Sequence, residues 1–180
     1  RIAGNYGVPV TLRTGIEGAL VLQPLTEFGT AEQIEKGLEL IFNGEGGGLA
    51  ITEPETSGSA IAREMESYYE YVDENTIHLN AKKYWQGNSQ SDFLLVAAKE
   101  RKDGKLSKTI SLVFVPKKYI TYDVLKSEGL KAVRYAINKI DANIPSNNVM
   151  QLSESKVNSL REFQNIFIRS RLQLIGMTHG

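Results

Sequence analysis

The apolar residues of this 180-residue chain change their spacing twice, and this change limits the folds open to it. From residue 1 to about residue 44 they recur every three to four positions, as in amphipathic helices. From about 46 to 145 the period is two, which is typical of half-buried strands. From residue 153 the helical spacing returns. We therefore predict an α+β fold with a helical segment, an antiparallel β-barrel or sandwich, and a further helix.

Local signals define the ends of the helical pieces. Pro24 is expected to end or kink the first apolar helix. Thr30 and Gln33 have the spacing of a capping box, in which each side chain bonds to the backbone N–H of the other residue. Gly44 follows the last helically spaced apolar residue and is expected to stop the second helix.

Seven candidate strands follow, separated by turn signals. The sequence Asp103-Gly104 predicts a hairpin tip, because tight turns need positive φ angles there. Short strands at this regular spacing favour an antiparallel barrel or sandwich over a parallel sheet. The predicted strands are 48–53, 64–72, 76–79, 83–85, 93–99, 109–115 and 133–140.

Composition excludes several functions. The 21 Lys and Arg balance 21 Asp and Glu, which argues against a sequence-blind nucleic-acid binder. The absence of cysteine excludes disulfides, thiol nucleophiles and Cys-ligated metals, and two histidines are too few for a multi-His metal site. No apolar run approaches the ~20 residues of a membrane helix, so we expect a soluble, cytoplasmic chain without a membrane or metal partner.

Two local features are candidates for ligand binding. A strand ends in Ile51-Thr52-Glu53-Pro54 and leads into a run of small polar residues, which suits close approach to a flat or phosphorylated ligand. The chain's one tryptophan, Trp85, lies at a strand end; a lone Trp is more often a core residue than a cofactor platform. The glycine-rich segment 44–48 lacks the Lys-Ser/Thr of a phosphate loop and is interpreted as a connector.

Several short motifs resemble, in order and spacing, those of the acyl-CoA dehydrogenase family. Each motif alone is unspecific, whereas the ordered set spans nearly the whole chain. The matching segments are FGTAEQ at 28–33, LAITEP at 49–54 followed by Gly58 and Ser59, LNAKKYWQGN at 79–88, DFLLVA at 92–97, FVP at 114–116 and the segment 141–145.

The resemblance implies a three-part architecture. Residues 1–45 would end an N-terminal helical domain, 46–152 would form the middle β-barrel domain, and 153–180 would be the first helix of a C-terminal helical bundle. Family members bind FAD and an acyl-CoA thioester between these parts. A carboxylate base takes the α-proton, and the β-hydride passes to flavin N5. The expected partners are an electron-transferring flavoprotein and further copies of the protein, as a homodimer or homotetramer formed through the bundle.

The resemblance also assigns roles to particular positions. The strand segment before Pro54 would bond to the flavin ring, and the small-residue loop after it would contact the FAD pyrophosphate. Ser59 in that loop would also contact the acyl-CoA substrate. The tryptophan would pack against the isoalloxazine, and the glycine two positions later would face N5. The implied cofactor-binding residues are Leu49, Ile51, Thr52, Gly58, Ser59, Trp85 and Gly87.

The sequence departs from the family pattern in the loop and at one flavin contact. Three residues separate Pro54 from Gly58 where the family usually has two, Ala60 replaces the usual Asp, and Gly87 stands where Thr or Ser is usual. No catalytic base is assigned, because the family's Glu comes from the C-terminal bundle outside these residues, and Ser170 occupies the alternative position. A flavin oxidase or monooxygenase of the same fold, and a catalytically degenerate binding module, remain alternatives.

Overall fold

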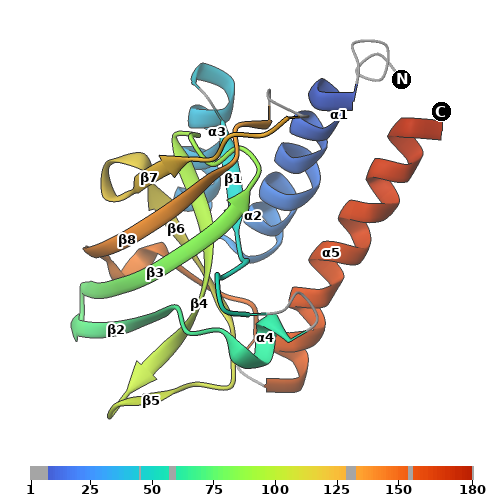
Figure 1. Cartoon of the computed structure of the whole chain (residues 1–180). Coiled ribbons are helices and arrows are strands. Elements are labelled where there is room, and N and C mark those ends of the chain that lie inside the picture. The colour runs from blue at the N-terminus through green and yellow to red at the C-terminus, as the bar shows by residue number, and fades with distance from the viewer. Residues whose placement is uncertain (1–7, 45, 57–59, 129–132, 154–155, 180) are drawn as a thin grey trace.

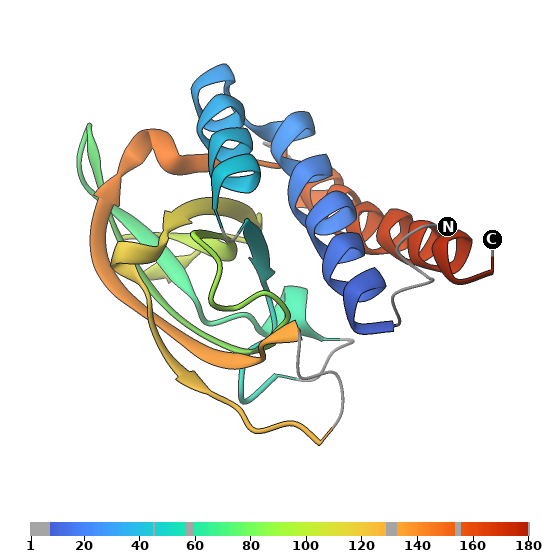
Figure 2. The same ribbon diagram turned by 90° about the horizontal axis from the view of Figure 1, so that it is seen from above.

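A computed structural model describes residues 8–44, 46–56, 60–128, 133–153 and 156–179. Figures 1 and 2 show the long N-terminal helical run and the final helix side by side, on one side of the β-structure. The order of helices, strands and a final helix confirms the predicted α+β fold.

The first helical run joins three segments without a break: α1 (Val8–Gly15), the π-helical segment η2 (Ile16–Leu22) and α2 (Gln23–Phe28). The last π-type hydrogen bond reaches the Gly18 carbonyl from the residue five positions later. Pro24 therefore lies in the first turn of a new α-helical segment, where a backbone N–H is not needed. The helix changes its geometry before this proline and does not end there.

Helix α3 (Ala31–Asn43) begins at the predicted capping box. The Gln33 N–H donates to Thr30 Oγ1 at 3.3 Å, and the Thr30 N–H donates to Gln33 Oε1 at 2.9 Å. Gly44 caps the other end, as predicted, but its φ of −140° is not left-handed. A Cβ there would lie 2.1 Å from Asp92 Oδ2 and 3.0 Å from the Leu40 carbonyl oxygen, so a larger residue would require the Asp92 side chain to move.

The described residues form nine strands in the order β7-β8-β3-β2-β4-β6-β9, with β1 and β5 also pairing with β4. Most pairs are antiparallel. The strands are β1 (Gly47–Ala50), β2 (Tyr68–Asp73), β3 (Thr76–Gln86), β4 (Phe93–Lys102), β5 (Lys105–Leu106), β6 (Ser111–Pro116), β7 (Thr121–Val124), β8 (Ala136–Pro145) and β9 (Val149–Gln151). The remaining elements are α4 (Ile61–Glu64), η3 (Lys117–Tyr119), η5 (Ser146–Asn148) and α5 (Lys156–His179).

Each predicted strand overlaps an observed one, and two of them merge. The predicted strands 76–79 and 83–85 are parts of the single strand β3, because Ala81 and Lys83 continue the inward alternation of its buried face. The hairpin tip is confirmed: Asp103 and Gly104 have φ angles of 52° and 74° between β4 and β5.

Two strands run parallel to β4, which the sequence did not predict. β1 pairs with β4 from Phe93 to Val96, and β2 pairs with it at Lys99 and Glu100. Because β6 occupies the opposite edge of β4, β1 and β2 lie end to end along the same edge. The described residues between them, 51–56 and 60–67, leave the sheet and then return to it.

Hydrophobic cores lie on both faces of β4. Phe93 and Leu95 face the helices and belong to a core that also contains Phe163 of α5. Leu94 and Val96 point the other way, into a core between the two halves of the sheet. The central strand is therefore buried on both faces, so its sequence is a continuous apolar run.

Helix α5 is anchored to the β-structure at one backbone position. Ser159 Oγ accepts from the Ile110 N–H at 2.9 Å and donates to the Ile110 carbonyl at 3.0 Å. Phe163 and Ile166 follow on the buried face. Although α5 has 24 residues, none of the described helices is long and apolar enough to cross a membrane.

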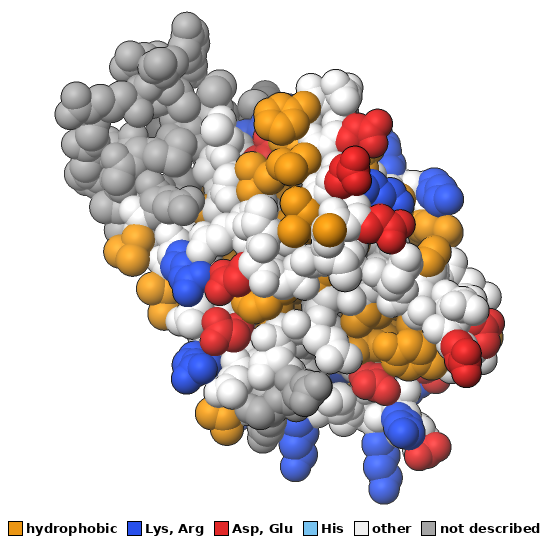
Figure 3. Space-filling model, turned by 180° about the vertical axis from the view of Figure 1, so that it is seen from behind, with side chains coloured by type: hydrophobic (Ala, Val, Ile, Leu, Met, Phe, Trp, Pro, Cys, Tyr) orange, Lys and Arg blue, Asp and Glu red, His pale blue; other side chains and the backbone are white. Residues whose placement is uncertain are grey.

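The surface carries mixed charge, in keeping with the balanced composition. On the face seen in Figure 3, basic and acidic side chains alternate, and among the side chains coloured there no wide area has a single sign.

Candidate functional site

The segment that leaves the sheet after β1 begins with residues of alternating exposure. The side chains of Leu49 and Ile51 are 8% and 6% exposed and lie in the core beneath the helices. Their side chains are therefore not available to a ligand. Thr52 follows with an exposed side chain. Of the residues predicted from the resemblance, Gly58 and Ser59 lie outside the described residues.

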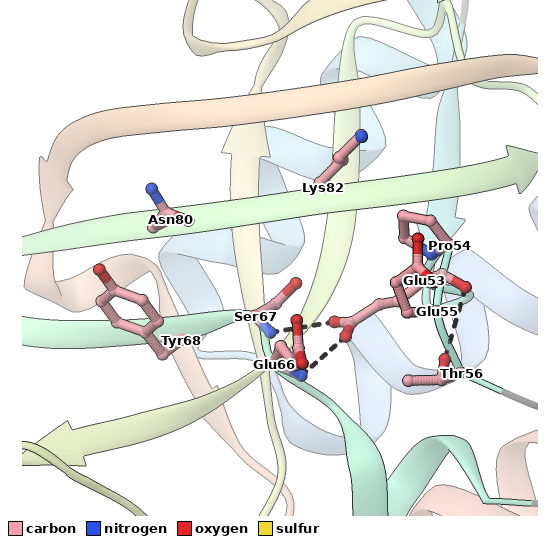
Figure 4. A pocket seen from close by; sticks show the side chains of 9 residues that line it. All are labelled: Glu53, Pro54, Glu55, Thr56, Glu66, Ser67, Tyr68, Asn80 and Lys82. Carbon is pink, nitrogen blue, oxygen red and sulfur yellow. Dashed lines mark hydrogen bonds between the residues drawn. The ribbon is translucent and has the colours of Figure 1, made fainter.

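The carboxylate of Glu53, near the start of this segment, bonds to residues at its end. It accepts from the backbone N–H of Glu66 at 2.7 Å and from that of Ser67 at 3.1 Å, and Figure 4 shows both bonds. Glu66 and Ser67 are the residues at which the chain returns to the sheet, so one side chain joins the two ends of the segment. A cavity of about 390 Å³ lies beside it, lined also by Tyr68 and Lys82.

The ammonium group of Lys83 lies beneath the same carboxylate. Lys83 Nζ donates to Glu53 Oε1 at 2.7 Å and to the Ile51 carbonyl at 3.2 Å, and the side chain is 0% exposed. Burial lowers the pKa of Lys83 to about 8, although the Glu53 carboxylate acts in the opposite direction. Burial acts to raise the Glu53 pKa, yet Lys83 and the Glu66 N–H hold it below its usual value. Both groups are therefore charged at neutral pH.

Trp85 lies at a bulge near the end of β3. Lys83 pairs with Asn138 and Gln86 with Ala136, so β3 has one residue more than β8 across this interval. Trp85 has a left-handed φ of 57°, its side chain is 56% exposed, and its ring makes an edge contact with Tyr135 at 6.2 Å. The tryptophan is therefore not a core residue; the bulge turns its ring toward solvent.

Backbone and side-chain bonds hold Thr52 close to the bulge. The Tyr84 N–H donates to the Thr52 carbonyl at 2.8 Å, and Gln86 Nε2 donates to the same oxygen at 3.4 Å. These donors flank Trp85 in the chain. The exposed Thr52 and the exposed Trp85 indole therefore belong to two segments that are hydrogen-bonded to each other through the Thr52 carbonyl.

Close packing around position 87 explains why a glycine stands there. A Cβ at this position would lie 2.5 Å from Ile16 Cδ1 in the π-helical segment η2 and 3.0 Å from Val133 Cγ1. The next residue, Asn88, bonds through Nδ2 to the Gly47 carbonyl at 3.3 Å. The glycine is therefore explained by the approach of η2 to the end of β3.

Replacing Gly87 by threonine should lower the free energy of unfolding by about 1–3 kcal/mol, because the new atoms overpack this contact. Adding Ile16→Ala should recover part of the loss, since it removes the nearest atom. Urea denaturation of the complete protein measures both effects. Gly18→Ala is the control, because a Cβ at Gly18 meets nothing within 4 Å. A Gly87→Thr variant as stable as the parent would contradict the packing argument.

The sequence did not predict the ion pair beneath the site. Lys83 and Glu53 were each assigned only to a predicted strand and to a family motif. One signal was available: in β3 the inward positions Ile77, Leu79 and Ala81 are followed at the same spacing by Lys83. A lysine on the apolar face of a strand requires a buried partner.

A second and larger cavity, of about 680 Å³, lies between α4, β4 and α5. Its lining combines apolar side chains such as Met65 and Leu160 with basic residues that include Lys99 and Lys108 and with the acidic residues Glu64 and Glu66. Ala60, which directly follows the loop predicted to contact substrate, also lines it. In the part of the chain that the structure describes, no group of three or more acidic or histidine side chains could hold a metal ion.

No protein-family model and no curated protein sequence matches the chain. Solved structures do match. Glutaryl-CoA dehydrogenase from Mycobacterium smegmatis is 22% identical over 94% of this chain and 42% of its own, with a TM-score of 0.77. The prolyl acyl carrier protein oxidase AnaB is 20% identical over 94% and 44%, with a TM-score of 0.80. An acyl-CoA dehydrogenase from Bacillus anthracis, complexed with FAD, is 26% identical over 94% and 28%, with a TM-score of 0.77.

The chain spans less than half the length of each of these proteins. Within that part, the superposition includes helices, sheet and final helix in the same order, since 94% of this chain is covered. The chain has the fold of the acyl-CoA dehydrogenase family.

Proposed function

We propose that the complete protein is an FAD-dependent enzyme that removes hydrogen from the α and β carbons of an acyl-CoA thioester. The observation that carries this proposal is the exposed Trp85 on its bulge, bonded through its neighbours to the exposed Thr52. Support also comes from neighbours of the same fold, which include dehydrogenases of acyl-CoA compounds and an FAD complex.

The residues present fit a flavin. The Trp85 ring is 56% exposed, and its residue has a left-handed φ, a strained conformation of the kind that is concentrated at ligand sites. A flat isoalloxazine offers a matching apolar face for this ring. Thr52 adds a hydroxyl, and the backbone of Leu49 and Ile51 adds further polar groups. In this proposal Gly58 and Ser59 contact the FAD pyrophosphate, and Gly87 lies near the flavin ring.

In this proposal the chain binds and orients, and the cofactor carries the redox chemistry. When bound, FAD supplies the acceptor for the β-hydride. Trp85 would hold the flavin ring and exclude water beside it, while Thr52 and the neighbouring backbone would bind the polar edge of the cofactor. The α-proton goes to a glutamate base that we assign to a part of the protein outside these 180 residues.

We place the CoA part of the substrate in the 680 Å³ cavity. Lys99 and Lys108 there offer positive charge to phosphate groups, and Leu160 offers an apolar surface to the chain that follows. Lys99 is 6% exposed and donates to the Arg63 carbonyl at 2.9 Å, so its cation is held at a fixed position. The proposed substrate contact Ser59 is next to Ala60 in this lining.

Further parts of the proposal concern the complete protein. Residues 46–152 would form its middle domain, between the end of a helical domain (1–45) and the first helix of a bundle (153–180). The bundle would form a homodimer or homotetramer, and an electron-transferring flavoprotein would reoxidise the flavin.

The test is direct. The complete protein, purified without oxygen, should contain yellow flavin that bleaches on addition of an acyl-CoA and recovers its colour with an electron-transferring flavoprotein. A colourless protein that neither binds FAD nor responds to acyl-CoA would refute the proposal.

A flavin oxidase is the second candidate. It is favoured by Gly87, which offers no side-chain hydroxyl to the flavin, and by the oxidase AnaB among the structural neighbours. Reoxidation by oxygen, with peroxide released and no transfer to a flavoprotein acceptor, would identify it. Hydroxylated product would indicate a monooxygenase, and flavin binding without any turnover a degenerate binding module.

A further inference from the structure

The Lys83–Glu53 ion pair is the most deeply buried charge pair among the described residues, with side chains 0% and 4% exposed. Each hydrogen bond of this pair joins two of three segments of the chain. Lys83 belongs to β3, Ile51 and Glu53 to the segment that leaves the sheet, and Glu66 and Ser67 to the segment that returns. The pair therefore joins these segments where no strand ladder does.

The two proposed flavin contacts lie directly beside this pair. Thr52 stands between Ile51 and Glu53, whose carbonyl and carboxylate both accept from Lys83 Nζ. Trp85 is two positions after Lys83, and the intervening Tyr84 N–H holds the Thr52 carbonyl. A shift of the lysine relative to the carboxylate would change the separation of the hydroxyl from the indole.

Stability alone does not explain a buried ion pair at this position. Two uncharged side chains of similar size often stabilise a protein as well as a buried ion pair does, because burial of charge is costly. What charge adds is fixed geometry: Glu53 accepts from three donors, and Lys83 donates to two acceptors. Such a network has few alternative arrangements.

We propose that the Lys83–Glu53 pair is a positioning device, which holds Thr52 and Trp85 at the separation that the flavin ring requires. Neither side chain touches the cofactor in this proposal; both act through their neighbours. The inference rests on the proposed flavin function for its purpose, although the positioning of Trp85 can be measured without flavin.

The test compares two double variants of the complete protein. Lys83→Met with Glu53→Gln removes the buried pair and leaves no unpaired buried charge. Lys139→Met with Asp123→Asn removes an exposed ion pair of the same 2.7 Å length on the neighbouring strands. The readouts are the unfolding temperature, the dissociation constant of FAD, and the ¹⁹F resonance of 5-fluorotryptophan at position 85, assigned with Trp85→Phe.

We expect the buried-pair variant to unfold within about 5 °C of the parent. Its ¹⁹F resonance should shift or broaden even without flavin, and its FAD affinity should fall about tenfold or more. The exposed-pair variant should change neither. An unshifted resonance, or a loss of affinity that simply follows a loss of folding, would overturn the proposal.

Two further comparisons decide the outcome if the buried-pair variant does not fold or if the parent does not bind FAD. If the buried-pair variant does not fold, Glu53→Asp retains the charge but shortens its reach, and it should shift the same resonance and weaken FAD; unchanged values would overturn the proposal. If the parent itself binds no FAD, the proposed function fails, while the flavin-free ¹⁹F comparison still decides whether the pair positions Trp85.

Discussion

Replacing Lys83 alone by methionine should lower the free energy of unfolding by about 3–5 kcal/mol, the cost of breaking a buried ion pair by removing one partner. The Glu53 carboxylate, 4% exposed, would keep its two backbone N–H donors but lose the cation bonded to it. The Ile51 carbonyl would also lose a donor. Chemical denaturation of the complete protein, followed by far-ultraviolet circular dichroism, measures the loss.

The neighbouring residue provides the matched control. Lys82 is exposed, and Lys82→Met removes the same charge from the opposite face of β3, so its effect should stay within about 0.5 kcal/mol. Adding Glu53→Gln to Lys83→Met should restore most of the stability, since no unpaired charge then remains. Equal effects of the two methionine variants would show that the buried pair contributes nothing.

Much of the fold could be predicted because its signals are local. The capping box needs only Thr30 and Gln33, three positions apart, and the hairpin tip needs only Asp103 and Gly104. Alternation located β2, β3 and β8, because each has inward residues that alternate with more exposed ones. β4 was found through its continuous apolar run, which reflects a core on each face.

The parallel arrangement around β4 could not be predicted from alternation. The residues that pair with β4 lie 46 positions away in β1 and 31 positions away in β2, and nothing in their side-chain pattern specifies that the two strands share one edge. The short strands β5, β7 and β9 also gave no signal; β7 (Thr121–Val124) is exposed throughout, so it has no apolar face.

Some features of the candidate site could likewise be predicted from the sequence, and others could not. Thr52, Trp85 and Gly87 were found through a motif resemblance, and the structure adds what holds them. The Lys83–Glu53 pair connects positions 30 residues apart, and the bulge at Trp85 depends on its register with β8. Both are properties of pairing between segments, which a single sequence does not display.

Replacing Trp85 by alanine should weaken FAD binding about ten- to a hundredfold, because stacking of an aromatic side chain on a planar base is worth roughly 1–3 kcal/mol. Stability should change little. The ring is 56% exposed, and its only described ring contact is the edge contact with Tyr135, worth about 0.5–1.5 kcal/mol. Fluorescence titration of FAD measures the affinity, with Trp85→Phe as the conservative variant. Phe42→Ala, at a 79% exposed position on α3, is the control.

Glycine at the same position separates ligand binding from folding. A left-handed backbone costs a side-chain-bearing residue about 1–2 kcal/mol, and glycine avoids this cost. Trp85→Gly should therefore bind FAD as poorly as Trp85→Ala and yet unfold at a higher denaturant concentration than the alanine variant. If both variants bound FAD like the parent, the exposed indole would not be a flavin contact. Weaker FAD binding together with higher stability would mean that the left-handed tryptophan at position 85 favours the ligand at a cost to folding.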